Sequence, residues 1–491
     1  MKPATNRKAT VAVDLGAQSC RVSLLRWQGE VPGIQVTHRF ANAPIRTELG
    51  WCWDIERIVA EVQTGLQLCA ELAGEGIATV AVDGWAVDYV RLARDGKPAA
   101  RPFCYRDERT EEAERAVHAI VSPERLYGET GIQILRLNTI YQLYADKLSN
   151  HFPEYPWVNL PEYVTYCLSG RRAAEFTNAT HTGLVELGKS RWNRALFEEL
   201  GLYLSAAPEI IPTGTLAGPL VAEFARHPSL SATLVIFPAC HDTASAIAAI
   251  PAVGDDWAFI SSGTWSLVGT VLDSTCTTEP ARRLNFTNLG GVGNKNCLLK
   301  NVNGMWLLRE CLNEWHELGH RWTMPQIVDS CRSLAAPCAC IDVDAPELMA
   351  PGQITQKINR QLERAGQPTF GFSGEDCLSL ANLIFHSLAA RYAQVLSDVT
   401  SLTNKKLKRL FIVGGGSKNT YLNALTAKRT GLEVIPGSAE STTIGNLAIQ
   451  LAASEEGLAV SSDGVSAGAV GRWAELLTRH TDSFSERCAP Y

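Results

Sequence analysis

The sequence has no run of apolar residues long enough to cross a membrane. Its first ten residues lead directly into Val11-Ala12-Val13-Asp14 and lack the long apolar core of a signal peptide. Lysine and arginine form no stripe beyond a short cluster at 405–409, and the net charge is −6, so the chain carries no electrostatic footprint for nucleic acid. We therefore expect a cytoplasmic protein that binds neither nucleic acid nor a membrane.

Metal and dinucleotide motifs are also missing. The fourteen cysteines show no zinc-ligand or redox spacing, and the close pair Cys338 and Cys340 is typical of reduced structural cysteines. The chain contains no Walker A sequence and no G-x-G-x-x-G pattern. These absences argue against a cysteine metal centre, a P-loop and a dinucleotide-binding fold.

The chain has the size and composition of a globular protein with more than one domain. It is 491 residues long, 46% hydrophobic and 20% charged, which is enough apolar material for two full cores. Pro251 and Gly254 interrupt the pattern between 248 and 256. We expect an N-terminal domain over 1–250 and a C-terminal domain over 251–491.

Two segments far apart in the sequence predict the same hairpin. The first has strands at 11–14 and 20–26 around a turn at 15–19, and the second has strands at 257–260 and 265–271 around a turn at 261–264. Repetition of one supersecondary unit indicates a duplicated architecture.

Further strands and helices follow each hairpin. Apolar runs predict strands at 79–82 and 87–92 in the first half and at 410–413 in the second. Helical periodicity extends over 55–73 and over 377–402. We therefore expect a mixed α/β protein with two similar lobes.

Asp14 and Gly16 predict a phosphate turn in the first hairpin. Asp14 ends a buried strand, and Gly16 permits a tight turn whose backbone N–H groups can face an anion. In that interpretation Asp14 holds a phosphate-bound Mg²⁺, usually through water. Taken alone, however, this segment also fits an ordinary hairpin turn, which is the commoner structure.

Gly414-Gly415-Gly416-Ser417 follows a predicted strand and precedes a helical pattern at 420–428. Glycines at such a position let a nucleotide approach the backbone closely. The motif alone indicates this function only weakly.

Asp242 lies at mid-chain, where the apolar strand 234–237 is followed by small helix-forming residues. An acid at a helix start is most often a cap, and a lone His241 is most often a packed histidine. In combination with Asp14 and the triple glycine, however, these residues provide a phosphate cradle, a metal anchor, a base and an adenosine platform. Those parts are typical of phosphoryl transfer, with Asp242 as the general base.

These segments together resemble the FGGY carbohydrate kinases of the actin/hexokinase superfold. The resemblance extends from Val11 to Ala453. It rests on nine ordered motifs: VAVDLGAQSCR (11–21), VDGWAVDY (82–89), YRDERT (105–110), GIQ with NTIYQL (131–143), EFTNATHTGL (175–184), HDTASA (241–246), SSGTWSL (261–267), LKNVNGMWLL (299–308) and IVGGGSKNTYLN (412–423). Within the family the motifs are most similar to those of the kinases of L-rhamnulose.

The resemblance implies two duplicated ribonuclease H-like domains around a catalytic cleft, and a role for each matched residue. ATP phosphates would contact Ala17, Gln18, Ser19, Cys20 and Arg21; the nucleotide would contact Thr264, Arg309 and Gly415; the ketose would contact Ala86, His241, Asp242, Thr243 and Asn301; Mg²⁺ would be held by Asp14. The implied reaction is ATP-dependent phosphorylation of the 1-hydroxyl of L-rhamnulose, with Asp242 as base. The implied partners are the ketose and ATP, and the chain is expected to be a monomer or a small homo-oligomer.

Several residues depart from the family pattern. Cys20 replaces a glycine of the phosphate turn, Gly84 and Ala86 replace the Thr and Gly of D-T-W-G, Leu289 replaces the Glu of T-N-E-G-G, and Arg309 replaces a nucleotide-side Gln. One methyl group in a sugar pocket changes discrimination by about 1–3 kcal/mol. A kinase of another ketose, L-fuculose or a pentulose, therefore remains an alternative, and a non-catalytic sugar sensor of the same fold is a third.

Overall fold

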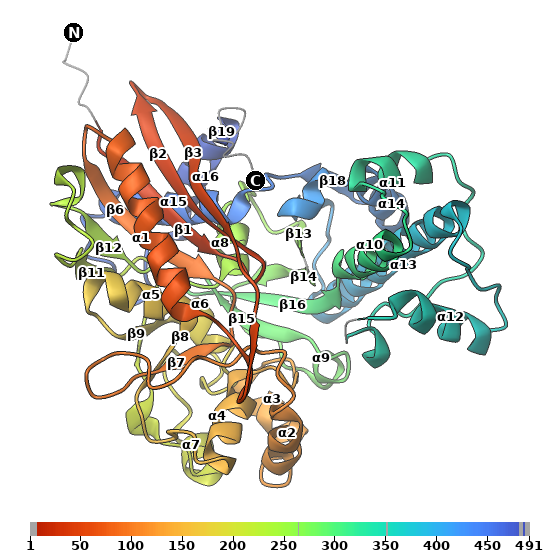
Figure 1. Ribbon diagram of the computed structural model, residues 1–491, viewed down its shortest axis with the longest axis horizontal. Helices are drawn as coiled ribbons and strands as arrows, with labels where there is room; N and C mark the ends of the chain where they lie inside the picture. Colours follow the sequence, from red (N-terminus) through yellow and green to blue (C-terminus); the bar gives the residue numbers. More distant parts are fainter. Residues whose placement is uncertain (1–6, 264, 350–351, 481–484, 487–491) are drawn as a thin grey trace. The chain divides into compact units, whose positions relative to one another are not determined.

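The computed structural model describes residues 7–263, 265–349, 352–480 and 485–486 (Figure 1). These residues form two compact units. The first unit comprises the described residues of Met1–Pro251, Leu272–Cys297 and Ser441–Tyr491, and the second those of Ala252–Val271 and Leu298–Glu440. The two units therefore alternate along the chain, and helices near its end fold with the N-terminal half.

A mixed sheet forms the centre of the first unit. Its strand order is β11 (Leu216–Pro219), β12 (Leu234–Ile236), β6 (Ile77–Gly84), β1 (Ala9–Leu15), β2 (Ser19–Gln28), β3 (Val31–Ala41) and β19 (Ser485–Glu486). Strands β1 and β2 are antiparallel, as the hairpin pattern predicts, and β1, β6 and β12 are parallel.

Alternate residues of β1 face two different helical layers. Val11, Val13 and Leu15 pack into a cluster with helix α1 (Ile55–Leu72), whereas Ala12 packs with helices α15 (Ser441–Glu455) and α16 (Ala467–Arg479). Both faces of the strand are buried, which explains its continuous apolar run. Figure 1 shows α1 in front of the sheet and α15 behind it.

The other elements of the first unit surround this sheet and extend below it in Figure 1. They are β4 (Ile45–Thr47), β5 (Gly50–Cys52), β7 (Tyr89–Arg91), α2 (Thr110–His118), α3 (Pro123–Thr130), α4 (Thr139–Leu148), β8 (Trp157–Asn159), α5 (Leu160–Ser169), β9 (Ala173–Glu175), α6 (Phe176–Thr180), α7 (Arg194–Leu200), β10 (Glu209–Ile211), α8 (Asp242–Ala248), α9 (Glu279–Arg283) and β15 (Thr287–Gly291).

The second unit contains another mixed sheet and several helices. Its strands follow the order β16 (Lys295–Asn303, within the unit from Leu298), β14 (Trp265–Leu272), β13 (Trp257–Ser262), β17 (Arg409–Val413) and β18 (Glu433–Pro436). Its helices are α10 (Trp306–Glu317), α11 (Met324–Cys331), α12 (Ile354–Arg364), α13 (Gly374–Thr403) and α14 (Thr420–Thr430). The long helix α13 contacts the sheet through Tyr392, whose hydroxyl lies 2.6 Å from that of Ser266.

The structure confirms the predicted duplication. In each unit an antiparallel hairpin, β1–β2 or β13–β14, has its first strand paired in parallel with a later strand, β6 or β17. The strand predicted over 87–92 is shorter and covers only β7. Val87 adopts a positive φ of 72°, which is incompatible with a regular strand.

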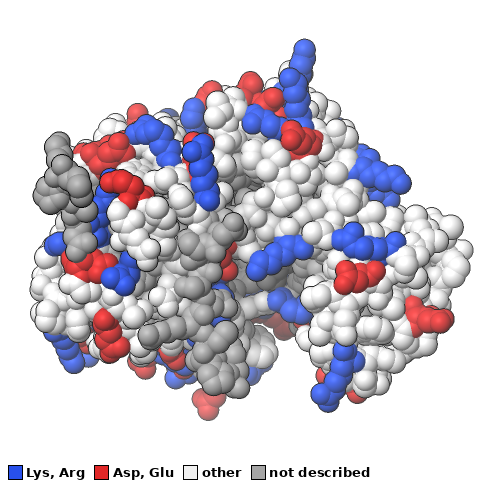
Figure 2. Space-filling view, turned by 90° about the horizontal axis from the view of Figure 1, so that it is seen from above, with Lys and Arg blue, Asp and Glu red and all other residues white. Residues whose placement is uncertain are grey.

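Among the described residues, no helix is long and apolar enough to span a membrane. Acidic and basic side chains are interspersed over much of the face that Figure 2 shows, as the composition leads one to expect.

Candidate active site

The turn between β1 and β2 has the close backbone approach expected of a phosphate turn. A Cβ at Gly16 would lie 2.4 Å from the carbonyl oxygen of Ser19, so only glycine fits. Asn42 bonds to the turn through two donors. Its side-chain N–H donates to the Gly16 carbonyl oxygen at 3.1 Å, and its backbone N–H donates to the Gln18 carbonyl oxygen at 2.9 Å. Gln18 and Ser19 are exposed and Ala17 is partly exposed, so the turn is open to a ligand.

Cys20 and Arg21 begin β2 and point in different directions. The thiol of Cys20 packs in the hydrophobic core, and burial followed by the charge of Asp14 raises its pKa to about 12. Arg21 instead donates from both Nε and Nη2 to Oδ2 of Asp14, at 2.8 and 2.5 Å. Arg21 thus places a cation beside the carboxylate, whereas only the backbone of Cys20 is suited to contact a phosphate.

Three aspartates lie at the carboxyl ends of neighbouring parallel segments. Asp14 pairs directly with Asp83 in the register of β1 and β6. The segment after β12 continues beside β6, because the N–H of Gly84 donates to the Cys240 carbonyl at 3.0 Å. Asp242 follows two residues later as the first residue of α8. The fold therefore gathers three acids at one edge of the sheet.

Burial and neighbouring negative charge disfavour the ionised forms of Asp83 and Asp242. Burial, and then the negative charge of Asp14, raise the pKa of Asp242 to about 7, although its side chain remains 33% exposed. Burial, Asp14 and Asp242 raise the pKa of Asp83 well above its usual range. A cation bound at this edge would relieve the repulsion.

Asp83 is hydrogen-bonded to helix α15, which lies near the C-terminal end of the sequence. Its Oδ2 accepts a hydrogen bond from Asn446 of α15 at 2.5 Å, and Gln450 donates both to Asn446 at 2.7 Å and to the Val11 carbonyl at 2.9 Å. The other oxygen of Asp83, Oδ1, is buried without a hydrogen-bond partner. A buried, orphaned carboxylate oxygen beside Asp14 fits a site that receives a hydrated cation.

Asp14 and the phosphate turn fit a magnesium ion that is held mainly by phosphates. In the described part of the chain, no three His, Cys, Asp or Glu side chains are grouped as a preformed metal centre. Mg²⁺ in phosphoryl-transfer enzymes typically binds one or two carboxylates and keeps several waters and phosphate oxygens as ligands. One carboxylate beside a turn whose Gln18 and Ser19 are exposed is therefore a suitable set of protein groups.

His241 and Thr243 flank Asp242 and contact the same oxygen. The hydroxyl of Thr243 donates to Oδ1 of Asp242 at 3.1 Å, and Nε2 of His241 lies 3.4 Å from that oxygen. Nδ1 of His241 lies 2.9 Å from Nε2 of His181. Burial lowers the pKa of both rings, that of His181 to about 3. For His241 the neighbouring His181 lowers the pKa further. Both rings are therefore uncharged at neutral pH.

The segment that contains Ala86 lies next to a buried acceptor. Oδ2 of Asp88 accepts hydrogen bonds from Nε1 of Trp53 at 2.6 Å and of Trp85 at 2.9 Å, and its Oδ1 accepts one from Gln142 at 3.1 Å. The two indole rings pack with centroids 4.6 Å apart. Despite these donors, burial raises the pKa of Asp88 to about 6.

Val87 holds this segment in an unusual backbone conformation. A β-branched residue at φ 72° is strained, and two donors fix its carbonyl: Thr139 at 2.7 Å and Gln142 at 3.2 Å. The neighbouring Ala86 is partly exposed. Strain of this kind is concentrated at functional sites, and Ala86 is the predicted sugar-contact residue beside it.

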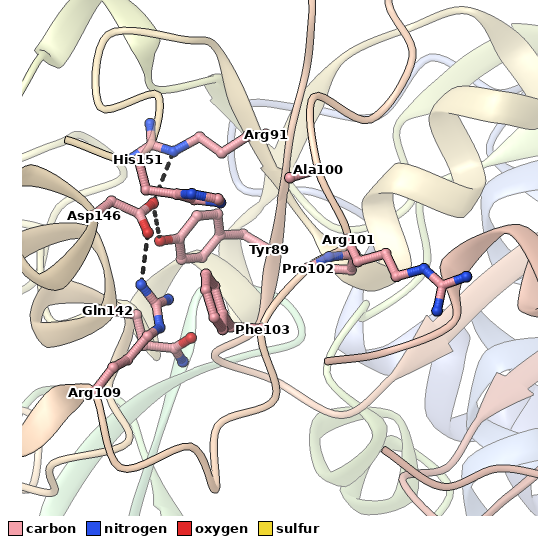
Figure 3. Close-up of a pocket in the computed structure, with 10 residues that line it drawn as sticks. All are labelled: Tyr89, Arg91, Ala100, Arg101, Pro102, Phe103, Arg109, Gln142, Asp146 and His151. Carbon is pink, nitrogen blue, oxygen red and sulfur yellow. Dashed lines mark hydrogen bonds and ion pairs between the residues drawn. The ribbon is translucent and has the colours of Figure 1, made fainter. Parts of the chain in front are cut away.

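Tyr89 and Arg91 of β7, which follows this segment in the chain, line a small pocket of the first unit (Figure 3). At its wall, Asp146 accepts hydrogen bonds from Tyr89 at 2.5 Å, Arg91 at 2.9 Å and Arg109 at 2.6 Å. Gln142, the donor to Asp88, lines the same pocket. The two arginines compensate the buried carboxylate, so this cluster serves as structural support for β7.

The second unit contains the remaining predicted site residues. Gly414, at φ 79°, and Gly416 lie against the end of β13, where Cβ atoms would be 2.9 and 2.0 Å from atoms of Ser262. Gly415 is exposed, and a Cβ there would meet nothing within 4 Å. Asn301 belongs to β16 and Arg309 to α10, whereas the predicted Thr264 lies outside the described residues.

The structure thus places Asp14, Arg21, His241, Asp242 and Thr243 together in the first unit. Sequence reasoning assigned no role to Asp83 and His181, although both lie within quoted motifs. A signal for Asp83 was available, because the letters TVAVD occur at both 10–14 and 79–83, and the two copies pair in register. Position 181 carried no comparable signal.

Sequence models of the FGGY family of carbohydrate kinases match most of the chain. The N-terminal domain of the family matches residues 9–249 and the C-terminal domain matches 258–454. The chain therefore belongs to the FGGY family of carbohydrate kinases and is an ATP-dependent sugar kinase.

Among the sugar kinases, the chain is similar in sequence to rhamnulokinases. A rhamnulokinase of Halalkalibacterium halodurans is 35% identical over 447 residues, which cover 90% of this chain and 92% of that protein. A rhamnulokinase of Bacteroides thetaiotaomicron is 35% identical over 444 residues, covering 89% of each.

Solved structures confirm the expected fold class. A ligand-bound xylulose kinase of Lactobacillus acidophilus superimposes with a TM-score of 0.73 at 15% identity, covering 97% of both chains. Glycerol kinase of Plasmodium falciparum with ADP gives 0.71 at 14% identity, covering 98% of this chain and 94% of that one. The chain has the duplicated ribonuclease H-like architecture of the actin/hexokinase superfold.

Proposed function

We propose that this kinase phosphorylates the 1-hydroxyl of L-rhamnulose and releases L-rhamnulose 1-phosphate. The observation that supports this most strongly is the identity of about a third to rhamnulokinases over nine-tenths of the chain. The grouping of Asp14, Asp83 and Asp242 at one sheet edge supports phosphoryl transfer at that place.

Asp242 is the proposed general base. Its carboxylate takes the proton of the 1-hydroxyl while the sugar oxygen bonds to the γ-phosphorus of ATP, and the bond from that phosphorus to ADP breaks. A pKa near 7 suits this task, because a base whose pKa lies near the working pH accepts the proton with a larger driving force. His241, Thr243, Ala86 and Asn301 are proposed to bind the ketose.

A second set of predicted residues is proposed to bind the nucleotide. The turn at 17–19, with Cys20 and Arg21, contacts its phosphates, while Gly415, Arg309 and Thr264 contact the remainder. Asp14 would hold Mg²⁺ through water, where the ion supplies charge stabilisation of the transferring phosphoryl group. In functional terms residues 1–250 are proposed to carry the sugar and phosphate sites, apart from the sugar contact of Asn301, and residues 251–491 the nucleotide site.

A ketose panel with an ADP-release assay tests the proposal. L-Rhamnulose should give the highest kcat/KM, and Asp242→Asn should lose turnover by about 10²–10⁴-fold while ATP binding persists. Preference for another sugar would refute the substrate, and full activity of the variant would refute the base.

Phosphorylation of another ketose, L-fuculose or a pentulose, is the second candidate. It is favoured by Gly84, where a Cβ would lie 2.8 Å from both Cβ and the carbonyl oxygen of Leu15 and 3.1 Å from Pro161. A threonine, usual in the family, does not fit this backbone without rearrangement. The strand end beside Ala86 is therefore packed more closely than a threonine at position 84 would allow. This closer packing can change the shape of the sugar pocket.

A further inference from the structure

Three side chains form a continuous series from helix α6 to the proposed base. Nε2 of His181 lies 2.9 Å from Nδ1 of His241, and the ring centroids are 3.9 Å apart. Nε2 of His241 lies 3.4 Å from Oδ1 of Asp242. His181 therefore reaches the carboxylate through one intermediate ring.

The chemistry of neutral imidazole fixes the direction of this series. A neutral imidazole has one N–H donor and one lone-pair acceptor, whereas an ionised carboxylate only accepts. His241 must therefore carry its proton on Nε2, facing Asp242, which leaves a lone pair on Nδ1. That lone pair needs a donor, and Nε2–H of His181 is placed to provide it. The opposite tautomer of His241 would direct a lone pair at the carboxylate.

Buried hydrogen bonds hold the two histidine segments together. Glu175 accepts from the backbone N–H of Cys240 at 3.0 Å and from the hydroxyl of Thr177 at 2.6 Å, and the same hydroxyl oxygen lies 3.4 Å from the backbone nitrogen of His241. Asn178 in turn donates to Glu162 at 2.8 Å. Helix α6 and the segment before α8 are thus linked by fixed contacts, and the distance between the histidines does not depend on loop geometry alone.

The two donors near Asp242 converge on one of its oxygens. His241 and Thr243 both lie near Oδ1, at 3.4 and 3.1 Å. Asp14, Asp83 and Arg21 are the charged groups that face the carboxylate from β1, β6 and β2. Because Oδ1 accepts from Thr243 and faces Nε2 of His241, Oδ2 is the oxygen with fewer of these contacts and the one better placed for the substrate hydroxyl.

We propose that His181 is a positioning residue of phosphoryl transfer: its Nε2–H sets the tautomer of His241, so that His241 and Thr243 hold Oδ1 of Asp242 and orient Oδ2 toward the sugar hydroxyl. The proposal rests on the proposed role of Asp242 as base. His181 acts through His241 and moves no proton of the substrate itself.

A pair of substitutions separates hydrogen bonding from packing. His181→Phe keeps a ring but removes the donor, and we expect kcat to fall by about 10–100-fold with the KM for ATP unchanged, because misplacing a reacting group costs up to about that factor. His181→Gln restores an N–H donor and should recover most of kcat. His118→Phe removes another partly buried histidine, bonded to Tyr141 and remote from Asp242, and should leave kcat unchanged.

Three results would overturn the proposal. The Phe and Gln variants could lose kcat equally, the Phe variant could keep its kcat, or the loss of kcat could follow a lowered melting midpoint. A second measurement does not depend on any variant. At about pH 8, where Asp242 is ionised, ¹⁵N NMR of the histidine-labelled wild-type protein should show His241 protonated on Nε2, and protonation on Nδ1 would overturn the proposal. If Asp242→Asn stays active, the base assignment has failed; if that variant is inactive and His181→Phe is fully active, only the role of His181 has failed.

Discussion

Replacing Asp242 by asparagine is expected to stabilise the ligand-free protein while it lowers turnover by about 10²–10⁴-fold. In the folded chain the carboxylate is crowded by Asp14 and partly buried, so its ionised form is disfavoured. Asparagine keeps an oxygen at Oδ1 for the donors His241 and Thr243 but carries no charge. Active sites commonly accept such destabilisation in exchange for function.

The size and sign of this effect follow from the pKa of Asp242. A rise from 3.8 to about 7 corresponds to about 4 kcal/mol at about 1.36 kcal/mol per pH unit. Because a third of the side chain is exposed, solvent screens much of this cost, and we expect about 1–2 kcal/mol. The folded state binds the proton more tightly than the unfolded state, so the cost is absent below about pH 4 and complete above about pH 7.

Thermal unfolding of the ligand-free protein at about pH 5 and about pH 8 measures this difference. At the higher pH the asparagine variant should melt a few degrees above wild type, and at the lower pH this gain should be smaller, because the folded wild-type protein then holds the proton on Asp242 for part of the time. Asp255→Asn, at an exposed position, is the matched control and should show no pH-dependent gain. No gain at about pH 8, or an equal gain at both pH values, would refute the electrostatic reasoning.

Three further predictions follow from the same structure. The kcat/KM of the kinase should fall below a pH near 7 as Asp242 becomes protonated, and a profile that stays flat down to about pH 4 would contradict its role as base. Gly84→Thr should lower the free energy of unfolding by about 1–3 kcal/mol, measured in urea, because its Cβ would overlap Leu15; an unchanged midpoint would show that the strand end relaxes freely. Gly415→Ala should leave the melting midpoint unchanged and raise the KM for ATP, whereas Gly416→Ala should lower the midpoint because its Cβ would meet Ser262; similar behaviour of the two variants would argue against a nucleotide contact at Gly415.

The sequence by itself determined the local elements and the family. Periodicity located α1 and α13 to within a few residues, and the hairpin pattern located both pairs of antiparallel strands. These features depend on residues close together in the chain, whose spacing is visible in the sequence. Position 87 is the exception: Val87 has φ 72°, and its carbonyl accepts hydrogen bonds from Thr139 and Gln142, which are distant in sequence.

Tertiary structure alone decided which charged and polar groups became neighbours. Asn446 follows Asp83 by more than 350 residues, yet it donates a hydrogen bond to Asp83 because α15 packs on β1 and β6, and Gln450 in turn donates to Asn446. The raised pKa of Asp242 and its series of contacts to His181 likewise arise from strand register and helix packing. Hydrogen bonds and charge interactions depend on distances of a few ångströms across the fold, and spacing along the chain does not contain those distances.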